Sequence, residues 1–183
     1  MGKEYTEIDA RIQRWIEQQH IFFVSTAPLA GDGLINCSPK GLDGFRVLNP
    51  GRIGYVDVGG SGIETVAHIK ENGRIVLMFC AFEGPPKIVR LYGRGEVIEP
   101  AHVDFDSLRD KFPTYASLRC FIRVACERIA DSCGWAVPKF DFQEQRSQLI
   151  EWAEHQGVEA VTDYQLEKNA ASLDGLPGLT SGS

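Results

Sequence analysis

Two long apolar segments, separated by a short break, constrain the fold of this chain more than any other feature of its sequence. The segments cover residues 74–82 and 87–98, with Gly84-Pro85-Pro86 between them. Glycine and proline interrupt a strand and favour a turn, so the second segment is expected to run back along the first. Both segments are apolar on both faces. Since the interior of a barrel covers one face of a strand, the other face needs a helix or a second subunit.

The other predicted strands cluster along the chain instead of alternating with helices. Strands are predicted over residues 20–27, 34–38, 45–48, 52–58 and 120–129. The first two form a hairpin, and Pro39 after them indicates a sheet edge or a bulge. Helices are predicted over residues 6–19, 61–72, 102–117, 142–155 and 158–169. This order argues against a doubly wound parallel sheet and predicts a mainly β (α+β) fold, an antiparallel barrel with peripheral helices.

The two ends of the chain are expected to be helical. At the N-terminus, Thr6 is predicted to cap the helix, with Asp9 in the capping-box position. Residues 1–140 are assigned to the barrel domain. Residues 141–183 are assigned to a helical extension and tail that pack on the same domain or on a partner subunit, and residues 172–183, rich in Gly, Pro and Ser, are expected to be extended or loose.

Composition excludes several classes of protein. The chain has 183 residues, 43% of them hydrophobic, and a net charge of −6. A partner nucleic acid bound through a basic face is therefore disfavoured. No apolar run approaches membrane-spanning length, so no association with a membrane is expected. The N-terminus does not resemble a signal peptide, so a cytoplasmic location is expected.

The cysteines and histidines do not form a metal-binding pattern. There are five cysteines, with no CxxC pair, and four scattered histidines. An odd cysteine count without a secretion signal is typical of reduced thiols. No metal is expected, because no histidine lies at zinc-site spacing from a cysteine.

A glycine-rich turn before the helix at residues 61–72 has two interpretations. The sequence Gly59-Gly60-Ser61-Gly62 could be a plain strand-to-helix connection with Ser61 as the N-cap, which the turn alone favours. It could also be an anion-binding nest, with donors from backbone N–H groups and from the hydroxyls of Ser61 and Thr65. Counter-charge for an anion could come from Lys40, Lys87 and Arg90, although each alone is ordinarily a solvated surface cation.

Other local patterns carry less information. There is no GxGxxG after a strand, no GxxxxGK[ST] and no GxSxG. Gly93-Arg94-Gly95 is interpreted as a bend or bulge in a strand. Tyr55, Tyr92 and Trp135 lie next to glycines, where a planar ligand could approach, but core packing is the ordinary role of such side chains.

With these residues described, the chain resembles the pyridoxamine 5′-phosphate oxidase-like family of FMN-binding split barrels. The matching segments are NCSPKG at residues 36–41, GYVD at 54–57, GSGIETVAHIKENGRIVLMF at 60–79 and RLYGRGEV at 90–97. Together they cover about half of the chain in the family's order. DSCGWAVP at residues 131–138 and KNAASLDGLPGL at 168–179 resemble a subgroup of uncharacterised flavoproteins. The resemblance implies a six-stranded antiparallel split β-barrel, a homodimer and an FMN cofactor.

The resemblance also implies the cofactor-binding residues. By this resemblance, the residues that contact the ribityl chain and the phosphate are Ser38, Pro39, Lys40 and Gly41. The residues on the strand that faces the isoalloxazine ring are Tyr55 and Val56. The phosphate turn falls on Ser61, Gly62 and Thr65, and a further contact on Lys87 to Arg90. Trp135 is added as a candidate planar contact. True pyridoxamine phosphate oxidases carry Arg-Lys where this chain has Glu64-Thr65, and a basic C-terminus that it lacks, so the resemblance favours the cofactor over that vitamin oxidase activity.

Two functions are compatible with these residues. The first is an FMN-dependent oxidoreductase acting on a small-molecule substrate or electron donor, in which no catalytic side chain is assigned because the flavin carries the hydride chemistry. The alternative is a non-catalytic protein that stores or senses flavin or haem. For the homodimer, the predicted seam is one face of the strand at residues 74–82, either Val76, Met78 and Cys80 or Ile75, Leu77 and Phe79. Alternatively, the C-terminal helices cover that face within one chain.

Overall fold

The computed structural model describes residues 2–180 and consists of one strongly curved sheet with five helices around it. The strands are β1 (Glu4–Tyr5), β2 (Phe22–Thr26), β3 (Asn36–Lys40), β4 (Phe45–Asn49), β5 (Arg52–Val58), β6 (Arg74–Cys80), β7 (Ile88–Ile98) and β8 (Leu118–Ser132). The helices are α1 (Ala10–Glu17), α2 (Glu64–Asn72), α3 (Phe105–Arg109), α4 (Gln148–Gln156) and α5 (Val158–Lys168).

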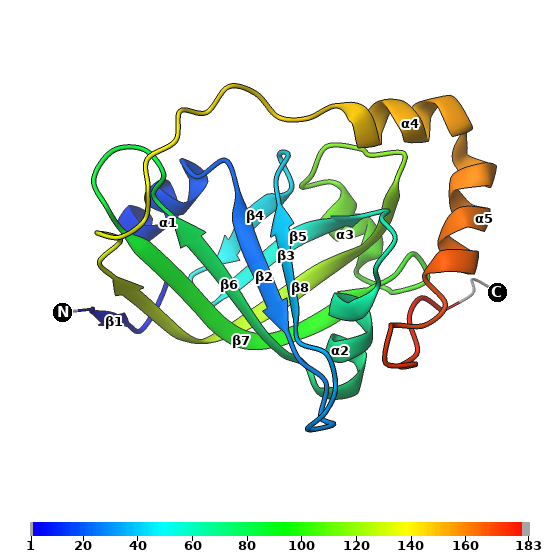
Figure 1. Ribbon diagram of the computed structural model, residues 1–183, viewed down its shortest axis with the longest axis horizontal. Helices are drawn as coiled ribbons and strands as arrows, with labels where there is room; N and C mark the ends of the chain where they lie inside the picture. The colour runs from blue at the N-terminus through cyan, green and yellow to red at the C-terminus, as the bar shows by residue number, and fades with distance from the viewer. Residues whose placement is uncertain (1, 181–183) are drawn as a thin grey trace.

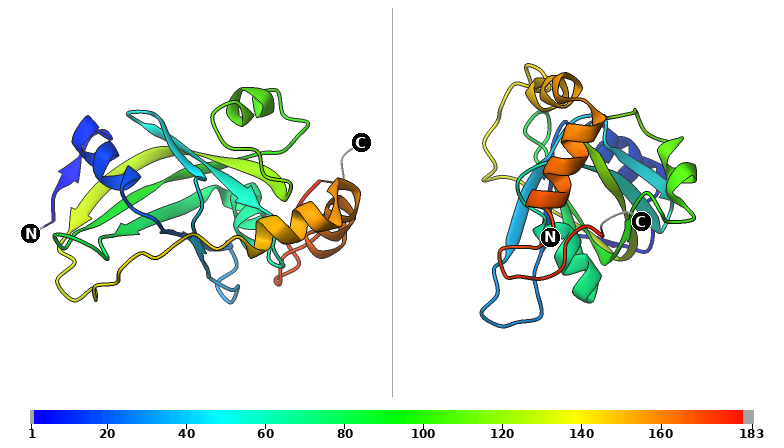
Figure 2. Two further views of the ribbon diagram at one scale, coloured as in Figure 1. Left: turned by 90° about the horizontal axis from the view of Figure 1, so that it is seen from above. Right: turned by 90° about the vertical axis from the view of Figure 1, so that its right-hand side faces the viewer.

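The strands form an antiparallel sheet in the order β3-β2-β6-β7-β8-β5-β4, and β1 pairs with β8. Figures 1 and 2 show that the sheet curls around a central interior. Within residues 2–180 the terminal strands of this order, β3 and β4, are not paired with each other, so the barrel is split there. The predicted antiparallel split barrel is confirmed, with eight strands in place of six.

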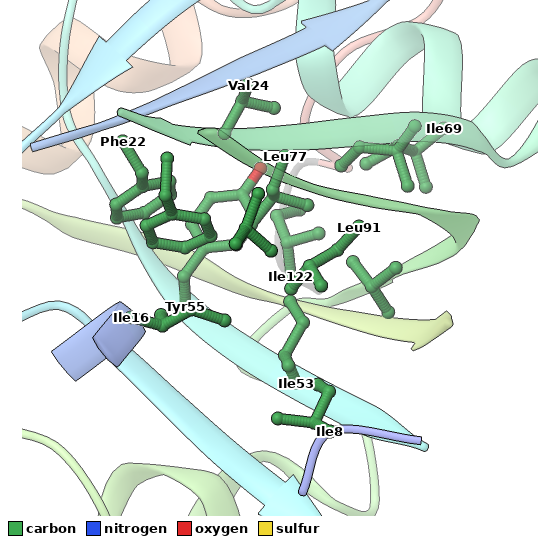
Figure 3. Close-up of a cluster of buried hydrophobic side chains, with 14 of the residues drawn as sticks. Ile8, Ile16, Phe22, Val24, Ile53, Tyr55, Ile69, Leu77, Leu91 and Ile122 are labelled. Carbon is green, nitrogen blue, oxygen red and sulfur yellow. The ribbon is translucent and has the colours of Figure 1, made fainter. Parts of the chain in front are cut away.

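The interior of the barrel is filled by side chains from every long strand. Aromatic rings of Phe22, Phe45 and Phe79 pack against one another with centroids 5.1–5.5 Å apart. Helix α1 contributes Ile12 and Ile16 to this interior. Figure 3 shows ten labelled members of the cluster: Ile8, Ile16, Phe22, Val24, Ile53, Tyr55, Ile69, Leu77, Leu91 and Ile122.

Alternation along β6 decides which of its faces lies inside. Ile75, Leu77 and Phe79 are buried in the barrel interior, whereas Val76 and Met78 are half-buried on the outer face; Cys80, the third residue of the other predicted seam, is buried and lines the cavity. The first group is therefore excluded as a seam between subunits. Figures 1 and 2 place α4 and α5 at one end of the molecule, near α2, and not across β6.

The bulge predicted at Gly93-Arg94-Gly95 is confirmed. The pairing of β7 with β8 shifts register between Tyr92 and Gly93. A Cβ atom on Gly93 would lie 2.0 Å from the carbonyl oxygen of Ala125 on β8. Only glycine permits this close approach of the two backbones.

The prediction for the first helix is wrong at its N-terminus. The helix begins at Ala10, and Asp9, not Thr6, is the N-cap; its carboxylate accepts hydrogen bonds from Arg11 N and Ile12 N at 2.8 and 2.7 Å. Residues Glu4–Tyr5 instead pair with β8. An aspartate cap satisfies two first-turn N–H groups at once, which fixes the start of the helix.

The prediction of Ser61 as the N-cap of α2 is also wrong. The helix starts at Glu64, Ile63 occupies the N-cap position, and no side chain caps it. The predicted end is confirmed, because Gly73 follows Asn72 with a left-handed φ of 72°. The first-turn N–H groups of α2 therefore have neither a helical acceptor nor a side-chain cap.

The second half of the chain differs from prediction in three places. The helix predicted at 102–117 is limited to α3, which covers a second apolar cluster on the outside of β5 and β8. The helix predicted at 142–155 begins only at Gln148. The tail, expected to be extended or loose, folds back through residue 180 onto α2, while residues 181–183 lie outside the described part.

One finding concerns membranes. Among residues 2–180, the structure contains no helix with both the length and the apolar character needed to cross a bilayer.

Candidate functional site

A large cavity opens at the split between β3 and the β4–β5 pair. Its volume is about 1070 Å³, slightly above the range of about 300–1,000 Å³ for small-molecule and cofactor sites. Six parts of the chain line it: residues 15–21 before β2, β3 with the turn after it, the end of β5 with the glycine turn, the first turn of α2, residues 80–85 at the end of β6 and after it, and residues 140–146, which are called the strap. Segments far apart in sequence therefore meet at one site.

A buried carboxylate holds two cations at the wall of this cavity. Asp57 on β5 is fully buried, and its two oxygens accept from Lys40 Nζ and Arg119 Nη2, each at 2.8 Å. Lys40 comes from β3, so this ion pair bridges the split in the barrel. Both cations line the cavity, so the triad itself carries one net positive charge, while Glu64, Glu83, Asp141 and Glu144 bring carboxylates to other parts of the lining.

The protonation of Asp57 follows from these contacts. Burial raises the pKa of the carboxyl, but the charges and hydrogen bonds of Lys40 and Arg119 outweigh burial, so the pKa lies below its ordinary value. Asp57 is therefore ionised at neutral pH.

Arg119 also holds the glycine turn. Its Nη1 donates to Gly62 O at 2.8 Å and to Asn169 Oδ1 at 3.0 Å. Its Nε has no partner within the described residues, although Arg119 is only 6% exposed. A buried guanidinium N–H without an acceptor is costly, so a ligand acceptor at this wall would be favourable.

Hydrogen bonds tie β3 to the first turn of α2. Ser38 Oγ donates to Asn36 Oδ1 at 3.1 Å, and Asn36 Nδ2 donates to Thr65 Oγ1 at 2.9 Å. All three side chains line the cavity. The strand therefore presents polar side chains beside the free N–H groups of the helix start, which is a suitable place for an anion.

The strap crosses the cavity and is fastened to the barrel at both ends. Phe140 N donates to Phe82 O at 3.1 Å, and the ring of Phe142 stacks on that of His20 with centroids 3.7 Å apart. Near the other end, Gln145 accepts from Leu42 N at 2.9 Å and donates to His20 O at 2.9 Å.

Leu42 is the one non-glycine residue with positive φ, 62°, within the described residues. Its N–H donates to the strap, so the strained turn after β3 and the strap support each other.

Seven of the twelve predicted site residues line the cavity. They come from β3 and the turn after it, from β5, and from the start of α2: Ser38, Pro39, Lys40, Gly41, Val56, Gly62 and Thr65. Their role toward a cofactor stays a prediction, but the structure brings them to one place.

The other five predicted residues lie elsewhere. Tyr55 points into the core, because it alternates with Val56 along β5. Ser61 is exposed beside the cavity wall without lining it. Lys87 pairs with Asp131 at 3.8 Å, and Arg90 donates to Ser132 Oγ at 3.1 Å. Trp135 is 84% exposed.

Sequence reasoning missed Arg119 and the strap. Arg119 lies between Leu118 and Cys120 on β8, but the predicted strand began at residue 120 and so excluded it. No local signal identifies Gln145, since its contacts depend on a segment that returns to the barrel from more than a hundred residues away.

Comparison with known proteins gives a consistent result. The sequence model of the family described as pyridoxamine 5′-phosphate oxidase matches residues 8–133. The pyridoxamine 5′-phosphate oxidase family protein ustO of Aspergillus flavus is 37% identical over 195 residues, covering 97% of this chain and 78% of that protein.

Solved structures agree on the fold. A HupZ variant of Group A Streptococcus has a TM-score of 0.53 at 20% identity, covering 68% of this chain and 99% of that one. A Clostridium acetobutylicum protein related to general stress protein 26, of the pyridoxine phosphate oxidase family, has a TM-score of 0.51 at 13% identity, covering 74% and 92%. With its family match, its curated relative and its split-barrel fold, the chain belongs to the pyridoxamine 5′-phosphate oxidase family.

Proposed function

We propose that this protein binds FMN in the cavity at the split of the barrel and acts as an FMN-dependent oxidoreductase. The observation that carries the proposal is the meeting of Lys40 and Arg119 with the uncapped start of α2 at one cavity wall. Cations and free helix N–H groups together favour a phosphate. Membership of the pyridoxamine 5′-phosphate oxidase family supports a flavin nucleotide as the molecule that carries this phosphate.

The residues present fit such a cofactor. The phosphate is assigned to the glycine turn and the first turn of α2, with the unpartnered Arg119 Nε as a further donor. The ribityl chain is assigned to Ser38 and Lys40, and the ring system to the wider part of the cavity under the strap. Glu64 also lines the cavity and brings a carboxylate close to the turn, which weakens the phosphate clamp.

A bound flavin supplies hydride and electron transfer, and the protein orients the ring and limits access to it. In this chain, orientation falls to β3 and the α2 turn, and access falls to the strap. The substrate is proposed to be a small molecule or electron donor that enters beside the strap.

The absorption spectrum of the purified protein, with and without a reduced nicotinamide, tests the function. Flavin bands that bleach on reduction support the oxidoreductase. Flavin bands that no donor bleaches favour the storage or sensing protein, and a Soret band favours a haem protein. Because the cavity has one phosphate-sized turn and the chain has no dinucleotide fingerprint, FMN is expected to reconstitute the apoprotein better than FAD. Reconstitution by FAD alone would contradict the proposal.

A Lys40→Ala variant is expected to bind FMN about ten- to a hundredfold more weakly, from the loss of a charge-assisted hydrogen bond worth about 1.5–3 kcal/mol. Lys3→Ala is the control, because Lys3 is exposed and its ammonium lies over the ring of Tyr5. Fluorescence titration gives both dissociation constants, and melting curves show whether each variant is folded. Equal dissociation constants for FMN in the two variants would show that Lys40 does not contribute to the binding site.

We also propose that the protein is a homodimer joined through the outer face of β2, β6 and β7. On this face Phe23 pairs with Met78, and Val76 pairs with Tyr92. All four side chains are half-buried within one chain. Two-fold homodimers are the commonest assemblies, and a second copy would cover these apolar groups.

A Val76→Glu variant is expected to shift the dimer toward monomers, because Val76 lies opposite Ser25 and Tyr92 on the neighbouring strands, so the new carboxylate would be buried in the seam with no cation opposite it. Light scattering across a dilution series measures the mass, and Lys111→Glu, at an exposed position elsewhere, is the control. Monomer formation is expected to release FMN. A wild-type monomer that keeps its flavin at low concentration would refute the seam.

A further inference from the structure

The tail after α5 is built into the wall of the proposed phosphate site. Asn169, which follows the last residue of α5, is fully buried. Its Nδ2 donates to Gly60 O at 3.0 Å, and its Oδ1 accepts from Arg119 Nη1 at 3.0 Å. One side chain therefore contacts both the glycine turn and the arginine that holds it.

These bonds fix the direction of the glycine turn. The carbonyl of Gly60 accepts from Asn169 Nδ2 at 3.0 Å and more weakly from Arg119 Nη1 at 3.4 Å, and the carbonyl of Gly62 accepts from Arg119 Nη1 at 2.8 Å. The peptides are trans, and a trans peptide directs its N–H opposite its carbonyl. The N–H groups of Ser61 and Ile63 therefore point away from the carbonyl oxygens that Asn169 and Arg119 hold, and of these two residues Ile63 is the one that lines the cavity, next to the first turn of α2.

The rest of the tail keeps Asn169 in place. Leu179 N donates to Asn169 O at 2.9 Å, which closes a loop over residues 169–179. A Cβ atom on Gly178 would lie 2.1 Å from that same oxygen, so the loop closes only with glycine there.

The end of the tail is tied to α2. Lys70 Nζ donates to Gly178 O at 2.6 Å and pairs with Glu99 at 2.5 Å, and Glu99 accepts from Thr180 N at 2.8 Å. These contacts give a structural role to the KNAASLDGLPGL segment at residues 168–179, for which the sequence alone indicated none.

We propose that Asn169 is a positioning residue for the flavin phosphate: together with Arg119 it orients the glycine turn so that its N–H groups bind the anion. The inference rests on the proposed function and adds the C-terminal tail to its site. Asn169 acts through the turn and does not touch the cofactor. Its removal therefore affects the phosphate-bearing flavin and leaves the ring-binding part of the cavity intact.

The test compares FMN with riboflavin, which has the same ring system and no phosphate. Asn169→Ala is expected to lower FMN affinity about tenfold, the effect of one or two lost hydrogen bonds. Riboflavin affinity is expected to change less than about twofold on the same scale. Asn169→Asp keeps the size and the acceptor toward Arg119 but turns a carboxylate oxygen toward Gly60 O, so it should show the same selective loss even if the alanine variant does not fold.

Asn72→Ala is the matched control. Asn72 is half-buried at the C-terminal end of α2, away from the glycine turn; its Nδ2 donates to Ala27 O and its Oδ1 accepts from Arg74 N, each at 2.9 Å. It should leave the ratio of FMN to riboflavin affinity unchanged.

A wild-type protein that binds neither flavin would overturn the proposed function and this inference together. A wild-type protein that binds FMN, with Asn169 variants that lose both flavins equally or lose neither, would overturn the inference alone.

Discussion

An Asp57→Asn variant is expected to lose about 3–5 kcal/mol of its free energy of unfolding, the cost of removing one partner from a buried ion pair. The carboxylate is fully buried and bonded to two cations at 2.8 Å. With a neutral amide in its place, Lys40 and Arg119 face each other without a counter-charge at a wall with little access to water. Urea unfolding followed by fluorescence gives the free energy and the midpoint.

The control for this variant is Glu127→Gln. Glu127 pairs with Arg94 at 3.3 Å, but both side chains are more than half exposed. Solvent-exposed pairs contribute about 0–1 kcal/mol, so this variant should unfold like the wild type. If Asp57→Asn and Glu127→Gln unfold at the same urea concentration, the buried triad contributes nothing beyond an ordinary surface pair.

The same carboxyl makes stability depend on pH. Since the folded pKa of Asp57 lies below its ordinary value, its contribution is present above the unfolded pKa of about 3.9 and is lost as pH falls through the folded pKa. The difference in unfolding free energy between wild type and Asp57→Asn should therefore be constant near neutral pH and shrink below about pH 4. A difference that grows in acid would contradict the ionised state of Asp57.

The fold could be predicted from the sequence because its signals are local. Apolar runs and the turn residues between them located β2, β5, β6 and β7, and the end of α2 at residue 72 was placed correctly. The start of α1 was placed wrongly because Thr6 and Asp9 are both good caps, and the choice between them depends on the pairing of residues 4–5 with β8. That pairing spans more than a hundred residues and leaves no local pattern.

Residues of the candidate site could be predicted where they lie on a strand or turn with a local sequence motif, and could not be predicted where only tertiary contacts bring them to the cavity. Ser38 to Gly41, Gly62 and Thr65 lie on short sequence motifs and line the cavity, and their role toward a cofactor stays a prediction. Tyr55 was misplaced because one step along a strand reverses the face, and Val56 alone points outward to the cavity. Arg119, Gln145 and Asn169 reach the site through tertiary contacts, so only the folded chain assembles them.

A Phe79→Ala variant is expected to lose about 3–5 kcal/mol, the range for deleting a large aromatic side chain from a core. Phe79 is 1% exposed, and its ring packs 5.4 Å from that of Phe22 and 5.1 Å from that of Phe45. Neighbouring strands hold these rings on several sides, so the barrel can close the resulting cavity only in part. Urea unfolding measures the loss, and an unchanged m-value shows that the same surface is exposed on unfolding.

Phe140→Ala is the matched control, since it deletes the same side chain from the strap. Phe140 is 60% exposed and touches the ring of Phe82 with centroids 5.4 Å apart, so its loss should cost at most about 0.5 kcal/mol. A large loss for Phe79 with a small one for Phe140 places the Ile75, Leu77 and Phe79 face inside the barrel and leaves Val76 and Met78 as the face available to a second subunit. If Phe79→Ala unfolds like wild type, the two faces of β6 are exchanged and the proposed seam fails with them.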